Sequence, residues 1–228
     1  MDFIKKNIFD LKHKISKSEI QYNRPKNSVL LMAVSKTQSP ENIIEAFNAG
    51  QRDFGENYIQ ESIEKISKLK KLDIIWHFIG KIQSNKSKII AENYDWVHSV
   101  DKISTLKKIN NYRCDSKNKI NICIQVNIDY EDSKSGIAPE EVECFINDTI
   151  KLDKVNIRGL MAIPMYQADH GKQYQTFMKI KNLFDELVNK GYKLDTLSIG
   201  MSSDYEAAIA AGSSIVRIGT AIFGERKK

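Results

Sequence analysis

The sequence predicts an α/β fold in which eight strand–helix units close into one (β/α)8 barrel over residues 1–228. Short apolar, β-prone runs alternate with amphipathic helical patterns about eight times along the chain. No Pro-rich or Gly-rich linker and no low-complexity tract interrupts this alternation. Strands separated by helices at this spacing are typical of parallel βαβ units, and 228 residues suit a single TIM barrel. An open, doubly wound sheet is the alternative, because the choice depends on the strand count.

The chain begins with a predicted amphipathic helix over residues 2–20, followed by a loop at 23–27 around Pro25. The helix is predicted from apolar residues at helical spacing, namely Phe3, Ile4, Ile8, Leu11, Ile15 and Ile20. The next run, 29–34, is apolar throughout, which is typical of a strand buried on both faces. It ends in Ser35 and Lys36, so a hydroxyl and an amine lie at the strand tip.

A helix start follows at Ser39-Pro40-Glu41, with Ser39 as the expected N-cap and Gly50 as the expected C-terminal cap. The remaining predicted strands are 53–57, 74–80, 96–100, 120–128, 157–163, 196–201 and 214–218. The helices after them are predicted at 58–69, 86–92, 102–110, 139–150, 172–189 and 205–211.

Composition favours an ordinary globular protein of the cytoplasm, with 41% hydrophobic and 28% charged residues. The net charge of +6 comes from lysines mixed with acidic residues, and no nucleic-acid motif is present. The dense lysine runs at 65–71 and 102–108 are interpreted as solvated helix faces, as are Glu61 and Glu64. No apolar run has the length of a membrane span, and the N-terminus lacks a secretory pattern. The three cysteines match no metal motif, so we expect free thiols and no metal.

Function in such a barrel gathers at the carboxyl ends of the strands. Lys36 ends the first predicted strand, Asn57 ends the second, and His77 lies near the end of the third. A strand-end lysine either extends its amine to water or serves as an amine nucleophile, because burial lowers the pKa of a lysine amine and frees its lone pair. His77, between two aromatic residues, is by itself more typical of a core histidine.

Two late segments, 198–204 and 217–224, are rich in Gly, Ser and Thr and follow the seventh and eighth strands. Small residues there let backbone N–H groups approach an anion, and these two loops often hold phosphate in barrels. Taken singly, each glycine is explained by a turn and Arg217 by a surface ion pair. The joint placement of Lys36 and both loops instead favours pyridoxal 5′-phosphate, which carries an aldehyde and a phosphate.

These residues resemble the YggS/PROSC family of pyridoxal phosphate homeostasis proteins. The matching segments are Ala33-Val34-Ser35-Lys36, 54–61, Trp76-His77-Phe78-Ile79-Gly80, 83–86, 133–137, Arg158-Gly159-Leu160-Met161, 198–204 and 216–224. They run in order from the first strand to the C-terminus. One departure is Gly80-Lys81-Ile82-Gln83, where the family usually has Gly-Pro-Leu-Gln, and it affects only a loop.

The resemblance implies a single barrel like the N-terminal domain of alanine racemase, with an extra N-terminal helix. It implies that Lys36 forms a Schiff base with the cofactor and that Arg217 meets the pyridine nitrogen, keeping it unprotonated and the ring a weak electron sink. The other implied pocket residues are Ser202, Gly219 and Thr220 at the phosphate, and Asn57, His77 and Met161 along the wall.

The function that this resemblance implies is a monomeric carrier that buffers pyridoxal phosphate, and related B6 vitamers, and hands the cofactor to apo-enzymes. Because the sequence ends at Lys228, we expect no second, β-rich domain of the kind that supplies a catalytic tyrosine in alanine racemase. The rival hypothesis is a racemase-like enzyme with Tyr58, Tyr166 or His77 as second acid/base. A phosphosugar-binding barrel would leave Lys36 unexplained.

Overall fold

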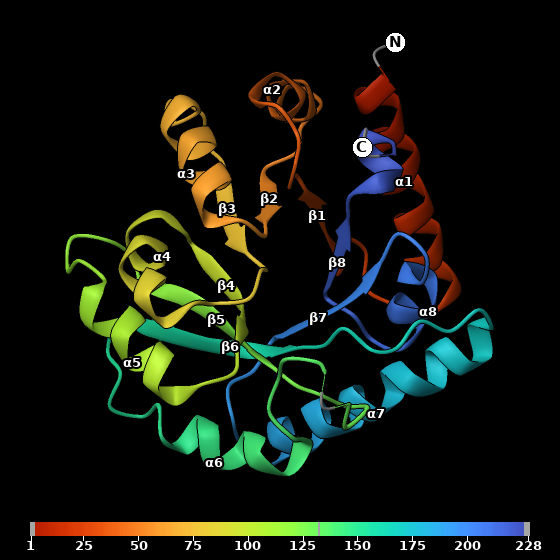
Figure 1. Cartoon of the computed structure of the whole chain (residues 1–228). Helices are drawn as coiled ribbons and strands as arrows, with labels where there is room; N and C mark the ends of the chain where they lie inside the picture. Colours follow the sequence, from red (N-terminus) through yellow and green to blue (C-terminus); the bar gives the residue numbers. More distant parts are fainter. Residues whose placement is uncertain (1–2, 132, 226–228) are drawn as a thin grey trace.

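Eight parallel strands close into a barrel in chain order, with β8 hydrogen-bonded to β1 (Figure 1). This computed structural model describes residues 3–131 and 133–225. The closed barrel confirms the predicted (β/α)8 fold and excludes the open sheet. The strands are β1 (Leu30–Val34), β2 (Asp53–Glu56), β3 (Ile75–Phe78), β4 (Trp96–Val100), β5 (Ile120–Gln125), β6 (Val155–Met161), β7 (Thr196–Met201) and β8 (Ile215–Ile218).

Helices surround the barrel and connect successive strands (Figure 1). The predicted helix at 139–150 is divided into a 3₁₀ turn and a shorter α-helix. Residues 1 and 2 and residues 226–228, included in the predicted domain, lie outside the described part. The helices are α1 (Phe3–Gln21), α2 (Pro40–Asn48), α3 (Ile59–Lys68), α4 (Ser87–Asn93), α5 (Ile103–Tyr112), α6 (Val142–Asn147), α7 (His170–Asn189), α8 (Tyr205–Ala210) and α9 (Thr220–Phe223), with 3₁₀ turns η1 (Ser84–Lys86) and η2 (Pro139–Glu141).

The start of α2 has the predicted cap. Ser39 accepts a hydrogen bond from the backbone N–H of Asn42 at 3.4 Å, and Pro40 occupies the first helical position, where no N–H is needed. Gly50 follows the helix with φ +85°, a left-handed conformation that favours glycine. These local signals place the first helix after β1 and therefore fix the length of the loop that carries Lys36.

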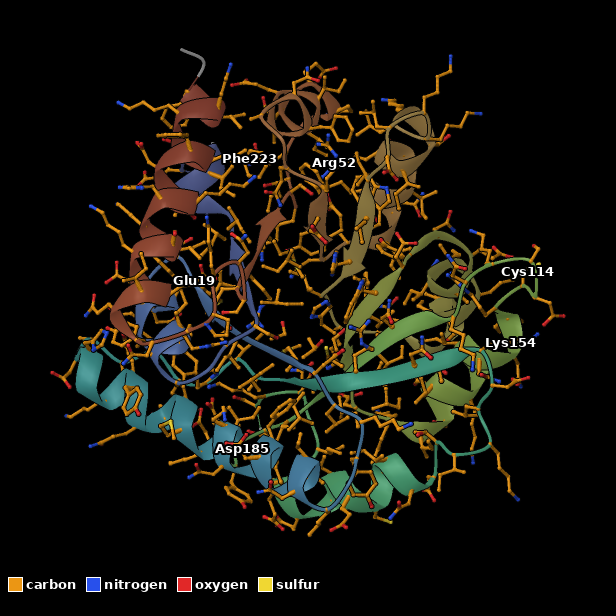
Figure 2. All side chains as sticks on the ribbon, turned by 180° about the vertical axis from the view of Figure 1, so that it is seen from behind. Glu19, Arg52, Cys114, Lys154, Asp185 and Phe223 are labelled. Carbon is orange, nitrogen blue, oxygen red and sulfur yellow. The ribbon has the colours of Figure 1, made fainter. Side chains whose placement is uncertain are left out.

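The N-terminal helix α1 packs across the outside of the barrel against α2, α8 and α9. Ile4, Ile8, Leu11 and Ile15 form its buried face. Phe3 and Ile20, predicted on the same stripe, are 61% and 76% exposed, because each neighbours a buried position, Ile4 and Glu19, and one residue turns the helix by about 100°. Phe223, labelled beside α1 in Figure 2, belongs to α9, which packs against this helix.

Two cores result from this architecture. Apolar residues fill the layer between strands and helices, whereas the barrel interior holds several buried polar side chains, among them His77, His98 and Arg217. Within the described part of the chain, no helix has both the length and the apolar character needed to cross a membrane.

Candidate cofactor site

A cavity of about 510 Å³ opens where the carboxyl ends of the strands meet, the location expected for the site of such a barrel. Seven of the eight predicted residues line it, and they come from strands, loops and the start of α9, far apart in the sequence. These are Lys36, Asn57, Met161, Ser202, Arg217, Gly219 and Thr220. The fold therefore brings the amine and the two small-residue loops to one cavity.

His77 does not line this cavity, so the expectation that it does is corrected. Its side chain is fully buried inside the barrel, where the ring stacks on Trp96 with centroids 5.6 Å apart. Side chains alternate between the two faces of a strand, so the residue two positions later, Ile79, shares its face and lines the cavity. His77 therefore shares the inward face of β3 with Ile79 but lies one layer of side chains below the cavity.

The loop that carries Lys36 is held by hydrogen bonds on both sides. The carbonyl of Ser35 accepts from the Lys65 amine at 2.7 Å, and the N–H of Thr37 donates to Glu61 at 2.6 Å. Thr37 has φ +65°, a conformation that costs free energy in a β-branched residue and persists only where neighbours enforce it. The backbone on both sides of Lys36 is therefore fixed by side chains of α3, and Lys36 itself lines the cavity.

A buried ion-pair network supplies these contacts. The Lys65 amine lies 2.9 Å from Glu56 and also pairs with Glu61, while the Ser35 hydroxyl donates to Glu56 at 2.6 Å. The side chains of Lys65 and Glu56 are 5% and 0% exposed. Burial raises the pKa of the Glu56 carboxyl, and the Lys65 charge opposes this shift.

The network corrects the interpretation of Lys65 and Glu61 as parts of a solvated helix face. Ser62, Lys65 and Leu69 are all buried, and their spacing places them on the face of the α3 segment that packs on the barrel. That spacing was visible in the sequence. The expectation failed because a serine and a lysine on this face do not make an apolar stripe.

Arg217 on β8 is a buried cation that donates hydrogen bonds to uncharged groups of Ser198 and Ala162. It donates to the Ser198 hydroxyl and to the Ala162 carbonyl, each at 2.9 Å, and to the Ser198 carbonyl. Burial lowers its pKa to about 10, and the nearby Asp204 carboxylate opposes this shift. Within residues 3–131 and 133–225, no carboxylate forms an ion pair with it. A buried guanidinium in this state favours a ligand with electron-rich acceptors.

The loop after β7 is shaped by Gly200. Its φ is +95°, and a Cβ at this position would lie 2.6 Å from the Cβ of Ala208. The pairing of β7 with β8 shifts register at this point. Asp204 then accepts a hydrogen bond from the Met201 N–H at 2.6 Å, which closes the turn and places Ser202 at the cavity.

The loop after β8 passes close to β1. A Cβ on Gly219 would lie 3.3 Å from the Val34 carbonyl, so glycine allows the two backbones to approach. Thr220 follows at the start of α9, and Gly224 with φ +83° closes the same wall. Both small-residue loops thus border the cavity with backbone and hydroxyl groups, as a phosphate cradle requires.

These residues fit pyridoxal phosphate. Lys36 would supply an amine for the aldehyde, and the two loops would supply small, polar surroundings for the phosphate. Asn57 adds a buried side-chain oxygen that has no hydrogen-bond partner among the described residues. A buried polar atom of this kind is satisfied when a ligand group or a water binds beside it.

Comparisons with known proteins agree with the geometry. The family model described as alanine racemase, N-terminal domain, matches residues 10–227. Proteins named pyridoxal phosphate homeostasis protein are 42% identical in Escherichia coli K12, covering 99% of this chain and 98% of the relative, and 44% identical in Pseudomonas aeruginosa, covering 99% and 97%.

Solved structures with the same fold include a relative with PLP bound and an alanine racemase. PipY from Synechococcus elongatus PCC7942, determined with PLP bound, is 33% identical with a TM-score of 0.80, covering 92% of this chain and 100% of that one. Alanine racemase of Clostridium difficile 630 shares the fold alone, at 15% identity and a TM-score of 0.74, covering 100% of this chain and 58% of that one. This chain belongs to the alanine racemase N-terminal-domain family, and within it to the pyridoxal phosphate homeostasis proteins.

Proposed function

We propose that this protein binds pyridoxal 5′-phosphate covalently on Lys36 and serves as a carrier that buffers the cofactor for B6 and amino-acid homeostasis in the cytoplasm. The observation that carries the proposal is the convergence of Lys36, Arg217 and both small-residue loops on one 510 Å³ cavity. The name of the Escherichia coli relative and the PLP bound to PipY support the same ligand.

When bound, the cofactor supplies an aldehyde that condenses with a primary amine, forming a C=N bond and releasing water. Lys36 provides that amine from its clamped loop. Arg217 would donate to the ring nitrogen of the bound cofactor while remaining charged, which would keep that nitrogen unprotonated. Ser202, Gly219 and Thr220, which line the cavity, would hold the phosphate, and Asn57 and Met161 would form the wall beside the ring.

A carrier is favoured over a racemase-like enzyme because the candidate second acids and bases are misplaced. Tyr58 and Tyr166 are 53% and 73% exposed, and neither lines the cavity. His77 is buried beneath it. Racemisation requires a proton donor on the opposite side of the bound substrate from the lysine, and none of these three residues stands there.

Intact-mass measurement after borohydride reduction tests the attachment point. The wild-type protein incubated with pyridoxal phosphate is expected to gain one reduced cofactor, and Lys36→Ala none. Lys88→Ala, which removes an exposed lysine outside the cavity, is the matched control and should keep the adduct. An adduct retained by Lys36→Ala would refute the assignment.

Deuterium exchange at the α-carbon of amino acids separates the carrier from the enzyme. A carrier should catalyse no exchange with a panel of amino acids in D₂O, yet deliver cofactor to an apo-enzyme and restore its activity. Rapid exchange that depends on Lys36 would establish the enzyme instead. Size-exclusion chromatography with light scattering measures the molar mass in solution and tests the expected monomer.

A further inference from the structure

A continuous chain of polar side chains crosses the barrel interior below the cofactor cavity. Arg217 on β8 donates to the Ser198 hydroxyl at 2.9 Å, and that hydroxyl lies 2.9 Å from Nδ1 of His98. Nε2 of His98 lies 2.9 Å from Nδ1 of His77, whose Nε2 lies 3.1 Å from the Asp53 carboxylate. Five side chains on five strands thus connect the cavity wall with the amino-terminal end of β2.

One set of neutral tautomers satisfies every hydrogen bond of this chain. The Asp53 carboxylate only accepts, so His77 carries its proton on Nε2 and its Nδ1 accepts from Nε2–H of His98. Nδ1 of His98 then accepts from the Ser198 O–H, and the Ser198 oxygen accepts from the Arg217 guanidinium, which only donates.

This assignment leaves no ring nitrogen or hydroxyl of the chain unsatisfied, and all the dipoles point the same way between a cation and an anion. Aligned hydrogen bonds in a low-dielectric interior polarise and strengthen one another. The Ser198 oxygen is therefore a better acceptor for Arg217 than an isolated hydroxyl would be. The described residues contain no cluster of metal-ligating side chains, so a metal site does not explain the two histidines.

The surroundings hold both rings in place and keep His98 neutral. His77 and His98 are fully buried, and burial together with His77 and Arg217 holds the pKa of His98 well below its usual value. Trp96 packs on both rings. The other titratable groups facing the chain are Cys123, Arg158 with Asp195, Asp204, and Lys12 and Arg52 near Asp53.

We propose that His77 and His98 are positioning residues for the cofactor: through Ser198 they fix the guanidinium of Arg217 against the cavity, with Asp53 as the anchor at the far end. The proposal rests on the proposed function, because it assigns Arg217 to the cofactor ring. Neither histidine touches the cavity, so their effect on the cofactor passes through Arg217 alone.

The first test reads the proton positions directly. The chain has four histidines, so ¹⁵N NMR of histidine-labelled, cofactor-free protein gives an assignable spectrum. We expect His77 and His98 both to carry the proton on Nε2, and Asp53→Leu, which removes the acceptor at the far end, to remove that preference in both rings. A proton on Nδ1 of His98 in the wild type would overturn the proposal.

The second test reads cofactor affinity. Ser198→Ala should weaken binding of pyridoxal phosphate about tenfold, the effect of one hydrogen bond of ordinary net strength. Ser213→Ala is the matched control, because Ser213 is equally buried but donates to strand carbonyls such as that of Ile199 at 2.8 Å. It should lower the unfolding temperature of the cofactor-free protein and leave affinity within twofold.

Substitutions of Asp53, at the far end of the chain of hydrogen bonds, test the same effect on cofactor affinity from a greater distance. Asp53→Leu removes the final acceptor and should weaken cofactor binding, whereas Asp53→Asn keeps an acceptor oxygen and should restore most of the affinity. Wild-type affinity in both Ser198→Ala and Asp53→Leu would refute the positioning role. A wild-type protein that forms no adduct on Lys36 would instead refute the proposed function, and the tautomers would still be measured.

Discussion

Lys65→Met is the perturbation whose outcome the structure defines most closely. The substitution shortens the unbranched side chain by one atom and removes its charge from a site that is 5% exposed. Glu56, which is fully buried, then loses its ion-pair partner, and the Ser35 carbonyl loses a donor. Breaking a buried pair from one side costs about 3–5 kcal/mol, because the remaining charge is uncompensated. For a chain of this length that is a decrease of about 6–20 °C in unfolding temperature.

The penalty should depend on pH in a known direction. Burial already raises the pKa of Glu56 above that of an exposed carboxyl, and Lys65 opposes the shift. Without Lys65 the pKa rises further, so the folded variant binds a proton more tightly than the unfolded chain does. Protonation then stabilises the fold, and the difference from wild type should shrink as pH falls from about 8 toward 5.

Urea denaturation of both proteins at several pH values measures this difference. Lys88→Met is the control, since Lys88 and Glu92 form an exposed pair 3.9 Å apart, and its change should stay within about 0.5 kcal/mol. Adding Glu56→Gln to Lys65→Met should recover part of the lost stability. A penalty below about 1 kcal/mol, or one unchanged by pH, would show that the network does not hold the Lys36 loop.

Three further outcomes follow from the geometry. Gly200→Ala should destabilise the fold by about 1–3 kcal/mol, because φ is +95° and a Cβ would lie 2.6 Å from that of Ala208; Gly191→Ala, with φ +96° and open space, should cost less, as urea denaturation would show. Glu19→Ala should cost about 2–4 kcal/mol in the same assay, because the buried carboxylate accepts the backbone N–H groups that lead into β1. Arg217→Met should lower affinity for pyridoxal phosphate at least tenfold by equilibrium titration while the cofactor-free protein remains folded, and unchanged affinity would exclude a role at the ring.

The features that could be predicted from the sequence are those written locally in it. The apolar run before Lys36 and the Ser39-Pro40 helix start each specify a strand or a helix within a few residues. Once strands and helices alternate about eight times, barrel closure places the strand ends together. For this reason the meeting of Lys36 with Gly219 and Thr220 in one cavity could be predicted without any contact information.

The remaining features depend on pairings between distant residues. The layer occupied by His77 depends on the stagger between β2, β3 and β4, which no single strand records. The burial of Lys65 depends on Glu56, which comes from another element and has no distinguishing pattern of its own. Buried polar networks of this kind replace an apolar stripe with hydrogen bonds, so hydrophobic periodicity does not detect them.

Visible absorption spectroscopy is the decisive measurement of cofactor attachment to Lys36. Spectra of the wild-type protein and of Lys36→Ala are recorded with pyridoxal phosphate, before and after borohydride. We predict a yellow imine band in the wild type that borohydride bleaches and that Lys36→Ala never develops. A wild-type protein that stays colourless at saturating pyridoxal phosphate, or a Lys36→Ala protein that turns equally yellow, would contradict it.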